Sequence, residues 1–166
     1  MREVEQYTIV YGEQSEDLLA LMVQRGPSYL HAVNTNETEV LKTNAKYWNL
    51  LPFQLVFVFP AHGTFWGQHP YCILDAEWVT EEQHEAARLY EDYLLAPEQQ
   101  SLAVDKGLRP ANQTISLHAP IALDHGTDPR VTPATAPSLP SPISAVAAAI
   151  KEVFHLAERK DTPTKP

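Results

Sequence analysis

Residues 53–71 read FQLVFVFPAHGTFWGQHPY and carry the strongest structural signals in the chain. The first seven of these residues form a dense apolar run, which predicts a buried β-strand. The part that follows, from Phe59 to Tyr71, combines glycines, aromatic rings, two histidines and a threonine. Because glycines let the backbone turn while the other side chains offer contacts, this composition is typical of a binding loop between two strands.

The sequence on both sides of this stretch predicts alternating strands and helices. Further strands are expected over 7–11, 29–33 and 70–74, which are rich in β-branched and aromatic residues. Helices are expected over 15–25, 36–46, 80–96 and 97–106, and from 141 onward. Two helix starts, Asn36 with Glu39 and Thr80 with Gln83, match the capping-box pattern. This alternation predicts an α/β protein, a three-layer αβα lobe with a mixed sheet.

Composition divides the chain into four parts. Residues 1–118 are expected to form the α/β lobe, and the Pro-rich stretch 119–142 an extended segment. Residues 143–160 are expected to form a C-terminal helix that packs on the lobe through an apolar stripe, and 161–166 a disordered tail. About four recognisable strands make a small sheet for an α/β domain, since sheets typically have roughly five or six. The sequence therefore indicates that part of the fold is contributed from elsewhere.

Charge and cysteine content exclude several classes of function. The 166 residues carry a formal net charge of -9, which would repel a phosphate backbone, so no nucleic acid is expected as a partner. The only cysteine, Cys72, excludes an internal disulfide and a cysteine-rich zinc fold. The first residues lack the basic and apolar regions of a secretory signal.

Four potential metal ligands lie in or near the loop: His62, His69, Cys72 and His84. Their spacing matches no ligand pattern of known geometry. Histidines hydrogen-bonded to the backbone and one free thiol are the simpler interpretation. We therefore predict no metal and no other cofactor.

A thiol- or metal-dependent enzyme is an alternative, in which Cys72 would act with His62 or His69. Side chains alternate along a strand, so in a strand over 70–74 His69 and Asp75 would face away from Cys72. This geometry opposes a catalytic triad. The prediction is that the protein is not an enzyme.

Non-covalent binding of a ligand is better supported by the residue types in the loop. Phe65, Trp66 and Tyr71 offer stacking surface, whereas Thr64 and Gln68 offer directional polar contacts. The alternative is that Trp66 and Phe65 cover the edge of the core, and the sequence supports the two interpretations about equally.

Several segments occur in an order and spacing that resembles bacterial extracellular solute-binding proteins. The resemblance covers about residues 7–160. The segments are RGPSYLHAV at 25–33, FP at 59–60, GTFW at 63–66, HPY at 69–71, LDAEWV at 74–79, EAAR at 85–88, YLL at 93–95 and GLRP at 107–110. Within that group the chain resembles the branch in which the binding module is often followed by a von Willebrand factor A domain.

The resemblance implies a type II periplasmic-binding-protein fold, in which two α/β lobes hold a small solute between them without catalysis. This chain is similar to the C-terminal half of such a protein, which implies transport or sensing outside the cytoplasm, in the periplasm or at the cell surface. The implied partners are a solute of unknown class together with an N-terminal lobe, a von Willebrand factor A domain or a membrane transporter.

The same resemblance places ligand-binding residues on loops that face the cleft. They are Asn34, Thr35, Glu37, Gly63, Thr64, Phe65, Trp66 and Tyr71. The alternative function is a protein–protein interaction module derived from such a half-fold, which would cover its exposed apolar face with another chain or as a homo-oligomer.

Overall fold

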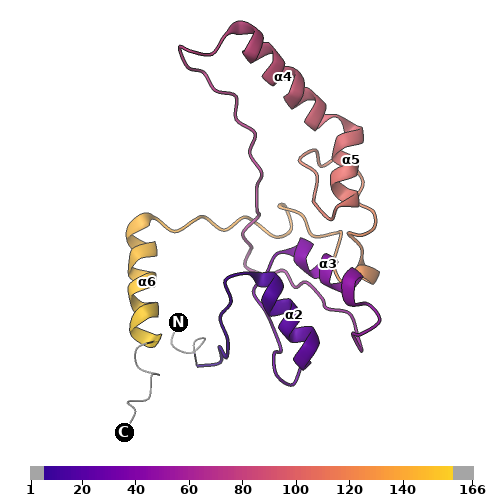
Figure 1. Cartoon of the computed structure of the whole chain (residues 1–166), viewed down its shortest axis with the longest axis vertical. Helices are drawn as coiled ribbons and strands as arrows, with labels where there is room; N and C mark the ends of the chain where they lie inside the picture. Colours follow the sequence, from indigo (N-terminus) through magenta and orange to yellow (C-terminus); the bar gives the residue numbers. More distant parts are fainter. Residues whose placement is uncertain (1–5, 159–166) are drawn as a thin grey trace.

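The structure, a computed structural model, describes residues 6–158 and consists of helices joined by long irregular segments (Figure 1). The helices are α2 (Ser15–Arg25), α3 (Glu37–Tyr47), α4 (Glu81–Leu95), α5 (Pro97–Asp105) and α6 (Ser144–Glu158), with a short 3-10 helix, η1 (Leu123–His125). α2 packs against α3, and α4 is followed directly by α5. The tail expected over 161–166, and the last two residues of the helix expected over 143–160, lie outside the described residues.

The predicted three-layer αβα lobe with a mixed sheet is wrong. Residues 6–158 contain no sheet, and their one strand-like pairing is a single parallel bridge between Thr64 and Ser138. An α/β classification and the type II periplasmic-binding-protein fold implied by the resemblance are therefore not supported. The described part of the chain is mainly helical and irregular.

At residues 53–59, where a strand was predicted, the backbone forms hydrogen bonds with groups that do not belong to a strand. Asn44 is buried on α3, and its Nδ2 donates to the carbonyl oxygen of Leu55 at 2.8 Å while its Oδ1 accepts from the Leu55 N–H at 2.9 Å. The Phe57 N–H donates to the carbonyl oxygen of Gly126 at 2.8 Å. One side-chain amide and one loop thus satisfy backbone groups that a neighbouring strand would otherwise bond.

The predicted helices are confirmed, but only one of the two capping boxes forms. At the start of α4 the Thr80 Oγ1 accepts from the Gln83 N–H at 3.3 Å, and the Gln83 Oε1 accepts from the Thr80 N–H at 2.9 Å. Asn36 precedes α3 without a side-chain capping hydrogen bond. α3 is fixed instead by its contacts with the rest of the chain, because Val40, Leu41 and Asn44 are buried.

The core is small and lies around α3 and α5. One cluster of its buried members consists of Leu41, Val104 and Ile121, with Ile115 and Leu117 packed against them. Ile121 belongs to the Pro-rich segment 119–142, which also buries Thr127 and Ala136. This segment therefore wraps around the helices, and much of it is fixed by contacts.

α6 stands apart from the other helices at the end of the chain (Figure 1). Ile143, Val146 and Ile150, on and just before this helix, are exposed. The packing partner that the sequence expects for the apolar stripe of this helix is therefore not seen at these positions. Within residues 6–158, no helix combines the length and apolar character needed to cross a membrane.

Candidate functional site

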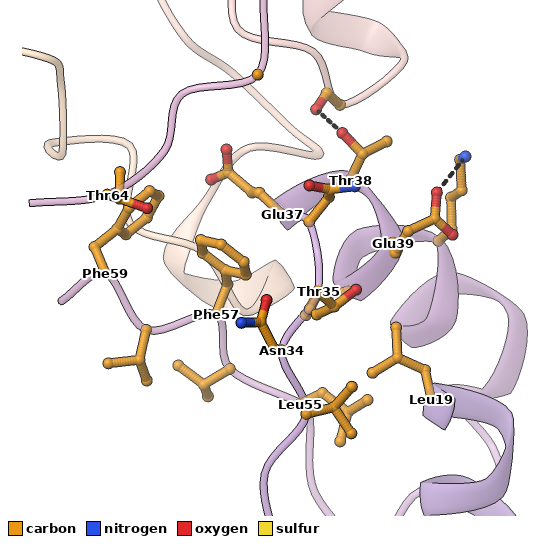
Figure 2. A pocket seen from close by; sticks show the side chains of 18 of the residues that line it. Leu19, Asn34, Thr35, Glu37, Thr38, Glu39, Leu55, Phe57, Phe59 and Thr64 are labelled. Carbon is orange, nitrogen blue, oxygen red and sulfur yellow. Dashed lines mark hydrogen bonds and ion pairs between the residues drawn. The ribbon is translucent and has the colours of Figure 1, made fainter. Parts of the chain in front are cut away.

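The predicted binding loop and the start of α3 border one large hollow, which we call the central hollow. It has a volume of about 3390 Å³ and is lined mainly by residues within 6–12, 26–42, 51–70, 100–117 and 129–139. Seven of the eight predicted ligand-binding residues line it: Asn34, Thr35, Glu37, Gly63, Thr64, Phe65 and Trp66. Figure 2 shows four of these residues around the space, on α3 and on the segments that precede and face it.

Tyr71 is the exception and lies against α4. Its hydroxyl donates to the carbonyl oxygen of Ala87 at 3.2 Å, and its ring meets the ring of Tyr90 edge-on at 5.8 Å between centroids. It is not among the residues that line the central hollow. The structure therefore separates Tyr71 from the other predicted site residues.

Glu37 is held in a largely buried ion pair at the start of α3. The Nε and Nη2 atoms of Arg109 donate to its two carboxylate oxygens, both at 2.8 Å. Only 12% of the Glu37 side chain and 14% of the Arg109 side chain are exposed. The Thr127 hydroxyl, also buried, donates to the same carboxylate. Bidentate arginine–carboxylate pairs are among the strongest polar contacts in proteins, so Glu37 is committed to a contact within the chain.

The remaining contacts of Arg109 extend this pair to two further segments. Its Nη2 donates to the Asp128 carbonyl oxygen at 2.9 Å, and its Nη1 donates to the Val131 carbonyl oxygen. The guanidinium carbon lies 5.5 Å and 5.7 Å from the ring centroids of Phe59 and Trp66, within the range of cation–π attraction. We call Glu37, Arg109, Thr127, Phe59 and Trp66 the Arg109 clamp.

Trp66 and Phe65 have different roles in the loop, although they are neighbours. The Trp66 Nε1 donates to the Ala136 carbonyl oxygen at 2.8 Å, and its ring stacks on Phe59 with centroids 5.7 Å apart. Phe65 is exposed. Trp66 therefore anchors the loop to the Pro-rich segment, and Phe65 is the ring that remains open to a ligand or a partner.

Gly63 and Thr64 join the loop to the same segment through the backbone. The Thr64 N–H donates to the Pro137 carbonyl oxygen at 3.0 Å, and the Leu139 N–H donates to the Thr64 carbonyl oxygen at 2.9 Å. Gly63 has a φ of +119°, and a side chain there would collide with the Pro137 carbonyl oxygen. The glycine is thus required for the two segments to approach each other.

Asn34 and Thr35 precede α3 at the border of the hollow (Figure 2). Asn34 is exposed. The Thr35 Oγ1 is shielded from solvent and has no hydrogen-bond partner among the described residues. Within the predicted site, this hydroxyl oxygen is therefore a shielded polar atom that makes no hydrogen bond to residues 6–158.

The histidines and the cysteine do not come together as a metal or thiol site. His62 and His69 line the central hollow, Cys72 is an exposed free thiol, and the His84 Nε2 lies 3.8 Å from Asp75 Oδ1. Among residues 6–158, no three His, Cys, Asp or Glu side chains form a group that could hold a metal ion.

An exposed ion pair stabilises the turn beside the Arg109 clamp. The Arg130 guanidinium donates to both carboxylate oxygens of Asp128, at 2.9 Å and 2.7 Å, and these bonds lower the pKa of Asp128 to about 2. The backbone carbonyl of the same residue bonds Arg109. The carboxylate therefore stays charged at ordinary pH and helps to hold the turn in place.

Sequence reasoning singled out Glu37 and Trp66 but missed Arg109, the residue that joins them. The available signal was an arginine next to a proline in GLRP, followed by a segment with few charges. The contacts above assign these residues to the internal framework of the protein. No family model, curated protein or solved structure matches this chain, so its function has to be inferred from this geometry.

Proposed function

We propose that this protein is a protein–protein interaction module whose apolar surface is covered by a partner chain. The observation that supports this most strongly is the surface area. The chain exposes 13000 Å², whereas a compact monomer of 18.6 kDa exposes roughly 8200 Å². The excess of about 4800 Å² is larger than the roughly 1000–2500 Å² that each partner buries in an obligate complex.

Much of this extra surface is apolar. Large apolar side chains are exposed along whole segments of the chain, among them Tyr7, Ile9, Tyr11, Phe53, Val56, Val58, Phe65, Leu74, Trp78 and Leu89. Single exposed apolar residues are common in monomers, but contiguous exposed apolar surface marks sites of association. A partner chain that covers these segments would supply the burial that the small core lacks.

The central hollow also suits a polypeptide better than a small solute. Its volume of about 3390 Å³ is several times the roughly 300–1000 Å³ of a typical small-molecule site. Glu37 and Trp66, which would have given a solute its charged and stacking contacts, are bonded within the chain. An interaction function is therefore the one that the geometry supports best.

Static light scattering of the full chain over a wide range of concentrations tests this proposal. We expect a mass above 18.6 kDa at high concentration, and binding of the apolar dye ANS wherever the chain is a monomer. A monomer that binds no ANS at any concentration would contradict the proposal, because it would have no exposed apolar surface for a partner to cover.

A further inference from the structure

We infer that the partner is a second copy of this chain, paired with the first through the backbone of residues 53–59. The two segments run antiparallel about a two-fold axis at Val56. This inference rests on the proposed interaction function and specifies which surface and which partner it uses.

In residues 53–59, the backbone hydrogen bonds follow the every-second-residue pattern of a β-strand. Leu55 and Phe57 both direct backbone N–H groups to one side, toward Asn44 and Gly126. The rings of Phe57 and Phe59 meet on one face, with centroids 4.8 Å apart, as residues two apart in a strand do. These contacts are the ones that an extended backbone gives from Leu55 to Phe59, although the structure pairs it with no strand within residues 6–158.

The opposite edge of this strand is open. Backbone groups of alternate residues point to opposite edges, so those of Gln54, Val56 and Val58 point away from Asn44. Within residues 6–158 the backbone N–H and carbonyl groups of these three residues have no hydrogen-bond partner. The Val56 and Val58 residues are 68% and 76% exposed, so a second chain can reach them. An unpaired edge of this kind is a template for another strand.

The sequence of the segment is compatible with its own reverse. Antiparallel pairing about Val56 sets this residue opposite its own copy, Gln54 opposite Val58, and Leu55 opposite Phe57. The Val56–Val56 and Gln54–Val58 pairs, whose backbone groups face the open edge, exchange both N–H···O bonds. Val56 meets its own β-branched copy and Leu55 meets the Phe57 ring, and apolar cross-strand pairs of this kind stabilise adjacent strands.

Charge favours self-association at this place in particular. The chain has a net charge of -9, so two copies repel each other over most of their surfaces. From Tyr47 to Leu74, however, the sequence contains no Asp, Glu, Lys or Arg. Two copies can therefore meet along 53–59 without bringing like charges together, and the surface available exceeds what a stable dimer needs.

A proline at the centre of the open edge provides the test. Val56→Pro removes the N–H that points to the partner but leaves the bonds of Leu55 and Phe57 within the chain untouched. Because each copy loses one hydrogen bond, we expect the dimer dissociation constant, measured by light scattering, to rise by at least about 30-fold. Val56→Thr keeps both the N–H and the β-branched shape, and we expect it to change the constant only a few-fold.

Amide hydrogen exchange of the unmodified chain tests the pairing without a variant that affects folding. We expect the N–H groups of Gln54, Val56 and Val58 to be protected at high concentration and to lose this protection on dilution. The N–H groups of Leu55 and Phe57, which bond within the chain, should stay protected at both concentrations. Exchange of Val56 and Val58 at the same unprotected rate in both samples would overturn the pairing.

The outcomes separate this inference from the function on which it rests. An assembly that persists unchanged in Val56→Pro overturns the pairing but leaves the interaction function in place. A monomeric wild type that binds ANS also overturns the pairing and leaves the interaction function in place, because the partner is then a different protein. A monomeric wild type that binds no ANS overturns both.

Discussion

Arg109 shows how one side chain can organise a protein whose apolar core is small. It joins the end of α5 to the start of α3 and to the turn at 128–131. A buried charge is costly unless it is paired, so this arrangement depends on the Glu37 carboxylate. The clamp therefore connects these segments through a few polar contacts where most proteins use apolar packing.

Replacement of Glu37 by glutamine should destabilise the protein by roughly 3 kcal/mol, because it leaves the Arg109 charge buried without its counter-ion. Urea unfolding at a fixed protein concentration measures this, since the proposed association would also contribute to stability. The matched control is Glu39→Gln on the same helix. Glu39 pairs with Lys42 near the surface, and its loss should cost less than about 1 kcal/mol. Equal unfolding midpoints for the two variants would contradict the role of the clamp.

His118 should titrate above its ordinary value. Its Nε2 lies 2.8 Å from Asp105 Oδ1, and this hydrogen bond, with a weaker one to the Ser116 carbonyl, raises the pKa of His118 above 6.5. In an NMR titration we expect the pKa of His118 to fall in the variant Asp105→Asn. The same pKa in both proteins would contradict the pair.

The stability that this pair contributes has a defined pH window. Because the folded-state pKa of His118 is raised, the contribution is fully present below the unfolded value of about 6.5 and is lost as the pH rises through the folded value. The urea midpoints of the wild type and Asp105→Asn should therefore differ at about pH 5.5 and converge at about pH 9.

At the scale of elements, α4 depends strongly on local interactions. None of its residues is buried, so tertiary packing contributes little to its stability. Its apolar face carries Tyr90 and Tyr93, whose rings stack on each other and meet Tyr71 at one edge. The capping box at Thr80 is therefore expected to matter more here than in a buried helix.

Thr80→Ala should lower the stability of α4 by about 1 kcal/mol, because it removes the acceptor for the Gln83 N–H. Amide exchange across residues 81–95 measures the change, and Thr80→Ser should restore the wild-type rates. Asn36→Ala at the start of α3 is the control, since Asn36 makes no side-chain cap bond, and it should cost only a few tenths of a kcal/mol. A larger effect at Asn36 than at Thr80 would contradict this account.

The elements also show which predictions a sequence can support. Helices were predictable because caps, stop residues and apolar spacing act within one element, as at Thr80 and Pro97. The sheet was not predictable, because β-branched residues at 53–59 favour an extended backbone but do not choose its hydrogen-bond partner. Here a side chain, Asn44, takes the place of a neighbouring strand for Leu55.

For the candidate site, the sequence indicated some of the residues that lie near one another but not the contacts between them. The sequence grouped Glu37 with Trp66, and both do border the central hollow. It could not show that Arg109, 72 positions after Glu37, would occupy the space between them. The contact that assigns these residues to the framework is therefore a long-range one, which local patterns do not encode.

At the scale of the whole molecule, the irregular shape in Figure 1 and the large exposed surface both agree with the proposed interaction function. Under the proposed interaction function, a chain that buries so little of its apolar sequence alone would gain the remaining burial by association. The stability of such a protein is expected to rise with its concentration. α6, with exposed apolar residues near its start, would then be a further part of the covered surface.

The contact between Asn44 and Leu55 also limits how large such an assembly can grow. An ordinary strand has two free edges, and a strand that pairs on one side still offers the other to the next molecule, as in amyloid fibrils. In this protein Asn44 and Gly126 already bond the second edge at Leu55 and Phe57. A third copy could pair with this edge only by displacing those contacts, so the same buried amide that takes the place of a neighbouring strand within the chain would also oppose the growth of a fibre between chains.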